Sequence, residues 1–278
     1  MTILKAALVQ LSTPADQVAA LAQAEPLVRC AAGHGAQLIM TPEATNILQR
    51  DRKALFEAVR SLEDDPCVQG LRALAKELGV WVLIGSALVR GEDGQLANRS
   101  TLVNPDGGVA ATYDKIHMFD VDLPTGERHR ESALYTPGEQ AVVATTPWGK
   151  LGMSVCYDVR FPHLYRALAK AGAEVISVPA AFTRPTGEAH WEVLLRARAI
   201  ETAAFVLAPA QGGFHEDGRG TWGHSTVINP WGEVIAKADH DEPDVILADL
   251  DLEEVAKARA AIPALVNDRA FSGPVASA

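Results

Sequence analysis

The chain has 278 residues, of which 48% are hydrophobic and 22% are charged. This composition can bury a large core and is unlike that of a disordered chain. Lys and Arg number 25 against 35 Asp and Glu, so the formal net charge is −10, which argues against a partner with a phosphate backbone. We therefore expect a globular protein that binds no nucleic acid.

The sequence has no stretch that is typical of a membrane span or a secretion signal. The longest uncharged apolar stretch, from Gly79 to Val89, has 11 residues, whereas about 18 are needed to cross a bilayer. In the opening MTILKAALVQ, Lys5 lies inside the apolar run and no small-residue cleavage site is offered. The three cysteines include no C-x-x-C pair, so neither a disulfide scaffold nor a zinc site is indicated. We expect a cytoplasmic protein with no membrane partner.

A β-α-β unit opens the chain. Residues 3–11 alternate and are rich in strand formers, residues 16–32 carry apolar side chains at helical spacing, and residues 36–40 form a short apolar strand. The alternation continues, with strands expected within 80–89, 149–156 and 173–180, and helices at 66–78 and 163–171. Because no Pro-, Ser- or Gly-rich linker divides the chain, we predict one α/β domain over residues 1–278, with helices outside the sheets.

Three short segments each carry a Pro with a Gly two positions later: Asn104–Gly107, Thr146–Gly149 and Asn229–Gly232. Pro sets the backbone at the second position of a turn, and Gly suits the last. Each segment therefore predicts a turn between antiparallel strands. Long crossovers together with these turns favour two mixed sheets packed face to face over a single doubly wound sheet or a TIM barrel.

Cys156 is a candidate nucleophile, because it ends an apolar strand and precedes the loop YDVRFP. Ligands of α/β proteins bind at the carboxyl ends of strands. A lone Cys is also a common core residue, which is how we interpret Cys30 and Cys67. The segment GMSVC nearly matches the G-x-S-x-G elbow of serine hydrolases but lacks the final Gly, so Ser154 is the alternative nucleophile.

Three further residues could take part in catalysis. Glu43 follows the strand AQLIM in the phrase TPEA, where a carboxylate at the rim of an apolar site can act as a base. Lys115 follows the strand GGVAATY. The non-catalytic alternative is that it is a surface lysine paired with Asp114. Glu131 lies in the polar loop PTGERHRES and by itself is expected to be exposed.

Taken together, these residues and their surroundings resemble the nitrilase superfamily of carbon-nitrogen hydrolases. The matching phrases are LIMTPEATN, YDKIHMFDVDLP and LGMSVCYDVRFPHLYRALAKAGAEVISVPAAF, which carry a Glu-Lys-Cys triad of Glu43, Lys115 and Cys156. Later segments, GEAHWEVLLRARAIET and WGHSTVINPWGEVIA, are most similar to the branch that contains deaminated glutathione amidases and omega-amidases. The resemblance implies a four-layer α-β-β-α sandwich, a homodimer or larger homo-oligomer, and no cofactor or metal.

The resemblance also implies the chemistry: hydrolysis of a primary amide of a small carboxylated metabolite by water, through a thioester on Cys156. Glu43 would act as the base. Lys115 and the backbone N–H of Tyr157 would stabilise the oxyanion, and Glu131 would hold Lys115 in place. Within the branch we expect a deaminated glutathione amidase that releases 2-oxoglutarate and Cys-Gly, with an omega-amidase acting on 2-oxoglutaramate or succinamate as the alternative.

A carboxylated substrate requires cationic and hydroxyl groups in the pocket. The expected substrate-binding residues are Tyr157, Phe182, Thr183, Arg184 and Thr186. Further cationic candidates lie in the loop of Glu131, namely Arg128 and Arg130, whereas Arg160 is expected to neutralise Asp158 in a buried pair.

Three other functions remain as alternatives. The fold could serve as a binding or scaffold subunit without activity, although the complete triad weighs against this. A metal-dependent hydrolase is disfavoured, because the eight His show no H-E-x-x-H or similar spacing. Arg196 and Arg198 could contact nucleic acid, but we expect them to pair with Glu192 and Glu201 on the same helix.

Overall fold

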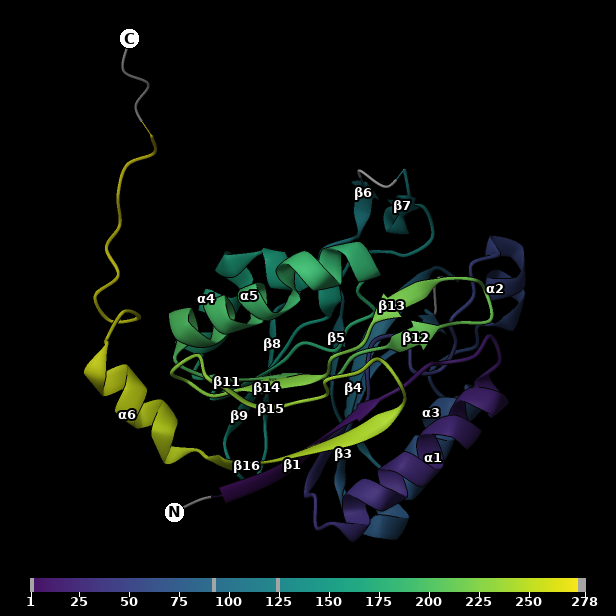
Figure 1. Ribbon diagram of the computed structural model, residues 1–278, viewed down its shortest axis with the longest axis horizontal. Coiled ribbons are helices and arrows are strands. Elements are labelled where there is room, and N and C mark those ends of the chain that lie inside the picture. The colour runs from purple at the N-terminus through teal and green to yellow at the C-terminus, as the bar shows by residue number, and fades with distance from the viewer. Residues whose placement is uncertain (1–2, 92–93, 124–125, 275–278) are drawn as a thin grey trace.

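The computed structural model describes residues 3–91, 94–123 and 126–274, so the two ends of the expected domain and part of the loop before Glu131 lie outside the described residues. Two six-stranded sheets form its centre (Figure 1). The first sheet has the order β16-β1-β2-β3-β4-β5 and the second β15-β14-β11-β10-β9-β8. Both sheets mix parallel and antiparallel pairs, as predicted.

The strands of the first sheet are β1 (Ile3–Gln10), β2 (Leu38–Met40), β3 (Trp81–Arg90), β4 (Leu96–Val103), β5 (Val109–Asp114) and β16 (Asp244–Asp251). Those of the second are β8 (Val142–Thr145), β9 (Lys150–Met153), β10 (Val175–Ser177), β11 (Phe205–Ala208), β14 (Thr226–Ile228) and β15 (Val234–Lys237). Two small hairpins stand apart, one of β6 (Asp120–Asp122) with β7 (Arg128–Arg130) and one of β12 (Gly212–Phe214) with β13 (Gly220–Trp222).

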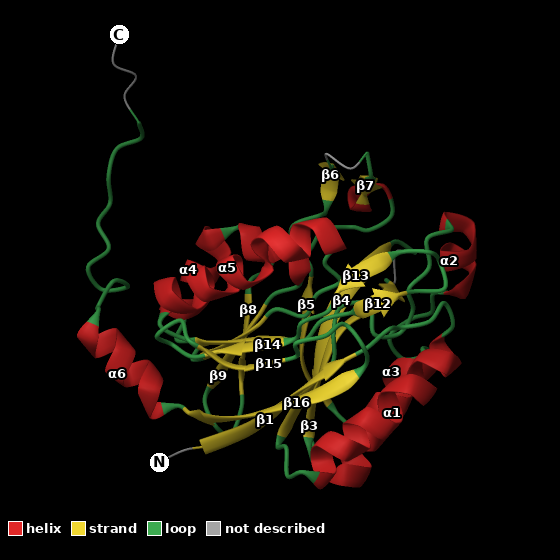
Figure 2. Ribbon diagram, in the orientation of Figure 1, coloured by secondary structure: helices red, strands yellow, loops and turns green. Residues whose placement is uncertain are grey.

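Helices cover the outer face of each sheet (Figure 2). The first sheet packs against α1 (Gln17–Gly33) and α3 (Pro66–Leu78), and the second against α4 (Pro162–Lys170) and α5 (Arg184–Thr202). Two further helices, α2 (Arg52–Ala58) and α6 (Glu253–Ala261), lie at the periphery. The α/β fold of two mixed sheets between helical layers is therefore confirmed.

Local sequence explains where the expected helices begin and end. The side chain of Asp16 accepts a hydrogen bond from the backbone of Ala19 and caps α1, and Asp65 caps α3 in the same way. Helix α3 ends at Gly79, whose left-handed backbone, with φ of 65°, suits a residue without a Cβ. The helices expected at 16–32, 66–78 and 163–171 are thus present to within one residue at each end.

The three expected turns are also confirmed. Asn104–Gly107 joins the antiparallel pair β4 and β5, Thr146–Gly149 joins β8 and β9, and Asn229–Gly232 joins β14 and β15. The strand expected over 149–156 is shorter, because β9 ends at Met153 and a 3₁₀ turn, η2 (Cys156–Arg160), begins at the cysteine. The chain leaves the sheet just before Cys156, which is where a nucleophile can be exposed.

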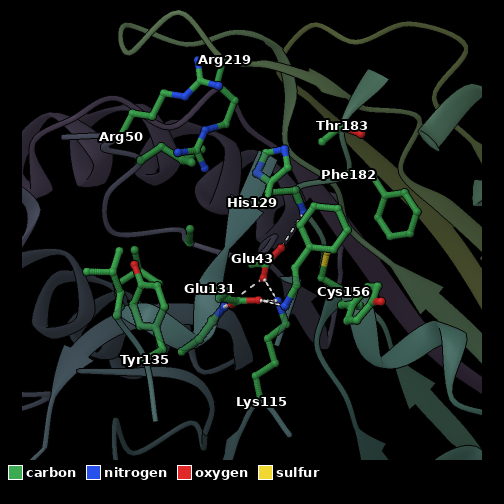
Figure 3. Close-up of a pocket in the computed structure, with 18 of the residues that line it drawn as sticks. Glu43, Arg50, Lys115, His129, Glu131, Tyr135, Cys156, Phe182, Thr183 and Arg219 are labelled. Atoms are coloured by element: carbon green, nitrogen blue, oxygen red, sulfur yellow. Dashed lines mark hydrogen bonds and ion pairs between the residues drawn. The ribbon is translucent and has the colours of Figure 1, made fainter. Parts of the chain in front are cut away.

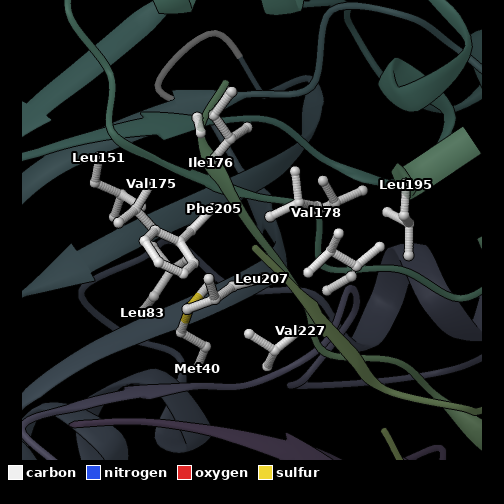
Figure 4. Close-up of a cluster of buried hydrophobic side chains, with 14 of the residues drawn as sticks. Met40, Leu83, Leu151, Val175, Ile176, Val178, Leu195, Phe205, Leu207 and Val227 are labelled. Atoms are coloured by element: carbon white, nitrogen blue, oxygen red, sulfur yellow. The ribbon is translucent and has the colours of Figure 1, made fainter. Parts of the chain in front are cut away.

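The main core lies between the two sheets and extends to α4 and α5 (Figure 4). Leu4, Ala6 and Leu8 of β1 face this core, whereas Ala7 and Val9 face α1 and α3. This alternation follows from the two-residue period of a strand. Burial of both faces explains why the central strands are almost continuously apolar and form a rigid base for the residues that follow them.

Candidate active site

Glu43 lies in the segment after β2, in contact with an irregular stretch of β3. The backbone N–H groups of Ala44 and Thr45 donate to the hydroxyl and the carbonyl oxygen of Ser86, both at 2.8 Å. A Cβ added to Gly85 would lie 1.9 Å from the carbonyl oxygen of Thr41, so only glycine permits this close approach. The Glu43 side chain is held in a buried position, and the residue is 6% exposed.

Lys115 directly follows β5. Its backbone N–H donates to Asn98 O at 2.9 Å, which continues the pairing of β5 with β4. The residue is 2% exposed, so the interpretation as a surface lysine paired with Asp114 is wrong. Asp114 instead accepts two hydrogen bonds from Arg99, at 2.7 and 2.9 Å.

Cys156 is the first residue of η2 and has a φ of +49°, a left-handed conformation that is rare for residues other than glycine. Its backbone N–H donates to Pro179 O at 2.9 Å, which fixes the strained turn to the end of β10. Such strain is concentrated at functional sites, where the surrounding structure enforces it. The turn presents the thiol to a cavity lined by Glu43 and Lys115.

The structure brings Glu43, Lys115, Glu131 and Cys156 together (Figure 3). The ammonium of Lys115 lies 3.0 Å from Glu43 Oε1 and donates to both carboxylate oxygens of Glu131, at 2.9 and 2.8 Å. The thiol of Cys156 lies in the same cavity, close enough to the Glu43 carboxylate for each group to shift the pKa of the other. Glu131 comes from the loop expected to be exposed, yet its side chain is only 12% exposed because it contacts Lys115 and the backbone of Phe119.

Burial and charge set the protonation states. Burial raises the pKa of Glu43, but the charge of Lys115 and hydrogen bonds to the carboxylate outweigh it and hold the pKa below its ordinary value. Burial lowers the pKa of Lys115, but Glu131 and Glu43 together raise it well above the usual range. Burial and then the charge of Glu43 raise the pKa of the Cys156 thiol well above its ordinary value. At neutral pH the group therefore contains a carboxylate, an ammonium and a thiol.

Two neighbours of the carboxylates were not found from the sequence. The side-chain amide of Asn98 donates to Glu43 Oε1 at 2.9 Å and to Glu131 Oε1 at 3.2 Å. The backbone N–H of Ala181 donates to Glu43 Oε2 at 2.9 Å. Asn98 lies inside β4 and Ala181 contributes only its backbone, so neither position carries a recognisable signal in a single sequence.

Asp158 connects the segments that carry Lys115 and Cys156. Its carboxylate accepts from the hydroxyl of Tyr113 at 2.7 Å and from the backbone of Val155 at 2.8 Å, and lies 2.7 Å from Nδ1 of His117. The expected Arg160–Asp158 pair is wrong, because these groups already surround the carboxylate. The Arg160 guanidinium instead lies near the ring of Phe182, 5.4 Å from its centroid.

A cavity of about 270 Å³ opens above the four residues. Four expected substrate-binding residues line it: Tyr157, Phe182, Thr183 and Thr186. Arg128 and Arg130 also line it, and both pair with Asp122. Residues that sequence reasoning did not assign to the pocket include Arg50, Phe119, His129, Tyr135 and Arg219.

The structure does not bring Arg184 into this group. As the first residue of α5 it points toward the β12–β13 hairpin, where its guanidinium pairs with Asp241 and lies 5.2 Å from the ring centroid of Phe214. Asp241 is distant in the sequence, so a local reading of AFTRP could not show that this arginine is already engaged.

The structure favours none of the alternative sites considered from the sequence. Ser154 is fully buried, and its hydroxyl donates to Ser177 O at 2.6 Å and contacts the Tyr165 hydroxyl at 2.7 Å. Over the described ranges, no group of three or more His, Cys, Asp and Glu is arranged to hold a metal ion. In the same part of the chain, no helix combines the length and hydrophobicity needed to cross a membrane.

The arginines expected to pair along α5 do so only in part. Arg198 binds Glu201 on the same helix, as expected. Arg196 instead donates to Gly232 O at 2.8 Å, and Glu192 accepts from Lys237 at 2.8 Å. Contacts of α5 with the β14–β15 hairpin therefore replace one of the two expected intrahelical pairs.

The sequence matches known proteins over most of its length. A deaminated glutathione amidase of Yersinia enterocolitica is 45% identical over 245 residues, which cover 87% of this chain and 84% of that protein. The human deaminated glutathione amidase is 42% identical over 87% of this chain and 75% of its own length. An omega-amidase of Danio rerio is 36% identical over 95% of this chain and 94% of its own length.

Solved structures share the fold. The NitFhit protein of C. elegans superimposes with a TM-score of 0.90 at 32% identity, over 97% of this chain and 66% of that chain. An amidase of Nesterenkonia sp. AN1, with the acetamide moiety of fluoroacetamide covalently added at its active-site cysteine, has a TM-score of 0.77 at 27% identity. That alignment covers 93% of this chain and 94% of the amidase.

The family model for carbon-nitrogen hydrolases matches residues 5–260, which include every residue of the buried group described above. A function as an enzyme is therefore favoured over a function as a scaffold subunit without activity. On the strength of this match and of the relatives, the chain belongs to the carbon-nitrogen hydrolase family and is a carbon-nitrogen hydrolase.

Proposed function

We propose that this enzyme hydrolyses the amide of deaminated glutathione through a thioester on Cys156. The observation that carries the mechanism is the position of Glu43, whose carboxylate accepts a hydrogen bond from the Lys115 ammonium and lies close enough to the Cys156 thiol to raise its pKa. The substrate is proposed from relatives of that name at 45% and 42% identity.

In the first half-reaction, Cys156 Sγ bonds to the carbonyl carbon while Glu43 accepts the thiol proton. The carbonyl oxygen becomes an oxyanion, which faces the Lys115 ammonium and the backbone N–H of Tyr157. Glu43 then donates its proton to the leaving nitrogen as the carbon–nitrogen bond breaks. This proton transfer is essential, because otherwise the thiolate would be the better leaving group and the substrate would re-form.

In the second half-reaction, Glu43 accepts a proton from water, whose oxygen attacks the thioester carbon. The second oxyanion is stabilised by the same two donors. Its collapse releases the carboxylic acid, and the thiolate of Cys156 takes the proton back from Glu43. Glu131 holds Lys115 through two hydrogen bonds and fixes the direction in which the cation points.

The two candidate substrates differ in their leaving groups. An omega-amidase substrate such as 2-oxoglutaramate is a primary amide and releases ammonia. Deaminated glutathione, which gives 2-oxoglutarate and Cys-Gly, is cleaved at a secondary amide and releases a dipeptide. The expectation of a primary amide therefore applies to the alternative function, supported by the 36% identical omega-amidase.

The test is to incubate the enzyme with each compound and to quantify 2-oxoglutarate, Cys-Gly and ammonia. We expect Cys-Gly release from deaminated glutathione with a kcat/KM at least about tenfold above that for 2-oxoglutaramate, and no release by Cys156→Ser. A reversed preference would overturn the substrate assignment. Full activity of Cys156→Ser would overturn the mechanism. A thioester on Cys156, trapped at acidic pH and located by mass spectrometry, provides a readout independent of turnover.

We further propose one domain over residues 1–278, a cytoplasmic location, and a homodimer or larger homo-oligomer, with no nucleic-acid or membrane partner. The pairing of β1 with β16 supports one domain, because it joins opposite ends of the chain in one sheet. Light scattering with size-exclusion chromatography tests the oligomer, and a single cooperative unfolding transition tests the domain. Fractionation of the source cells tests the location.

A further inference from the structure

Arginine is concentrated around the cavity of an otherwise acidic protein. The described lining includes six arginines: Arg50, Arg52, Arg128, Arg130, Arg160 and Arg219. Its only acidic residues are Glu43 and Glu131, and both are bound to Lys115. With a net charge of −10 over the whole chain, this arrangement favours entry of an anion.

Arg50 and Arg219 come from different parts of the fold and meet near His129. Arg50 lies in the segment that continues from Glu43, and Arg219 lies in the turn of the β12–β13 hairpin. Burial lowers the pKa of His129, the neighbouring Glu127 opposes this shift, and the charges of Arg219 and Arg50 lower the pKa further, so both guanidinium groups act on the same ring. Figure 3 shows both arginines beyond His129 when viewed from Lys115.

These groups have donors that the described protein leaves available. Arg50 has no hydrogen bond or ion pair with any described residue, and the Tyr135 hydroxyl, close enough to be influenced by Arg219, has no described hydrogen-bond partner. Nε2 of His129 is buried and makes no hydrogen bond, although Glu127 Oε2 lies 3.6 Å from it. Arg219 lies 3.1 Å from the buried Asp217, which orients the guanidinium and leaves most of its five N–H donors free. By contrast, Arg128 and Arg130 both pair with Asp122.

The position of Glu43 indicates which end of a substrate would reach these donors. Glu43 delivers a proton to the leaving nitrogen, so the leaving group lies on its side of the thiol. From Glu43 the cavity continues to Arg50 and Tyr135, whereas Phe182 and Thr183 lie on the side of Cys156 (Figure 3). A dipeptide leaving group extends roughly 7 Å, which carries its terminal carboxylate away from the reacting atoms.

We propose that Arg50 and Arg219, with Tyr135 and His129, form a subsite for a carboxylate carried by the leaving group. This inference rests on the proposed function and deepens it. The preferred substrates are secondary amides whose amine portion ends in a carboxylate, and the guanidinium groups bind that carboxylate. Ammonia released from a primary amide has no group that could use this subsite.

The experiment measures binding rather than turnover. The Cys156→Ala protein is titrated calorimetrically with deaminated glutathione and with the same compound bearing a C-terminal carboxamide. We expect the acid to bind about 10- to 100-fold more tightly than the amide, which corresponds to roughly 1.4 to 2.8 kcal/mol. Adding Arg219→Gln or Arg50→Gln should bring this ratio toward 1, whereas Lys53→Gln should leave it unchanged. Lys53 is a matched control, because it is 87% exposed and near Arg50 in sequence without lining the cavity.

The possible results separate failure of the subsite from failure of the proposed function. Equal binding of acid and amide, or a ratio that persists in both arginine variants, overturns the subsite while leaving the proposed function intact. Binding of neither compound overturns the subsite as well. If the wild-type enzyme fails to cleave deaminated glutathione but Cys156→Ala binds the acid selectively through Arg50 and Arg219, the proposed function fails and the subsite stands.

Discussion

Glu131 binds the ammonium of Lys115 with both carboxylate oxygens, at 2.9 and 2.8 Å, whereas Glu43 binds it with one oxygen at 3.0 Å. The second oxygen of Glu43 instead accepts from the backbone of Ala181. The two glutamates are therefore not equivalent. Glu131 holds the cation, and Glu43 keeps a position from which it can exchange a proton with the thiol.

Replacing Glu131 by Gln should lower kcat by about 10- to 100-fold, because Lys115 loses its two-point anchor and the loop loses an acceptor for the Phe119 backbone. Steady-state kinetics with a circular dichroism check of folding measure the effect. Ser132→Ala is the control, since its hydroxyl bonds to Asp120 in the same loop and does not touch Lys115. Equal losses in both variants would mean that Glu131 acts only by ordering the loop.

Replacing Glu43 by Gln should separate turnover from thiol reactivity. Turnover should fall by ~10²–10⁴-fold, because the variant has no general base. The charge of Glu43 is one cause of the raised pKa of Cys156, so this pKa should fall in the variant and alkylation by iodoacetamide should begin at lower pH. Peptide mass spectrometry quantifies the alkylated Cys156. Loss of alkylation together with turnover would contradict the assigned role of Glu43.

The pH dependence of kcat/KM follows from the pKa shifts of Glu43 and Lys115. Because the pKa of Glu43 lies below its ordinary 4.5, the base form is present above that value and activity falls only as the pH drops through the lowered pKa. Lys115, whose pKa is raised well above 10.5, remains charged throughout. The profile should be flat from about pH 6 to 9. A rising limb near the pKa of a free thiol would show instead that the reacting species is a preformed thiolate.

Gly85→Ala should destabilise the protein and also lower activity. The added Cβ would meet the carbonyl oxygens of Thr41 and Pro42 at 1.9 and 2.6 Å, and backbone atoms there cannot move without displacing Glu43. We expect a loss of roughly 1–3 kcal/mol in the free energy of unfolding. Gly33→Ala is the control, since no atom other than those of its chain neighbours and its own helix backbone lies within 4 Å of its added Cβ. Urea denaturation of both variants gives the comparison, and equal stabilities would contradict the role of Gly85.

The sequence was sufficient to predict the fold and to predict that Glu43, Lys115 and Cys156 act together. The alternation of β1, the caps of α1 and α3 and the three Pro-containing turns are local patterns, and each reflects a local physical cause. Glu43, Lys115 and Cys156 could be identified because each lies in a distinctive phrase after a strand.

The rest of the site depends on contacts between distant segments. Asn98 has the appearance of an ordinary strand residue until β4 and β5 pair beside Glu43. Glu131 appears exposed until its loop folds onto Lys115. Arg184 was expected in the pocket, but Asp241, far along the chain, holds it elsewhere. No periodicity or local spacing reports such contacts.

The pairing of β1 with β16 also has a consequence for how the protein is made. Strand β1 leaves the ribosome long before its antiparallel partner, which spans residues 244–251. Until then β1 has an unpaired edge, which can pair with other strands. The first sheet is completed only after residues 244–251 have been synthesised, so the nascent chain depends on slow, long-range pairing and is vulnerable to aggregation in the meantime.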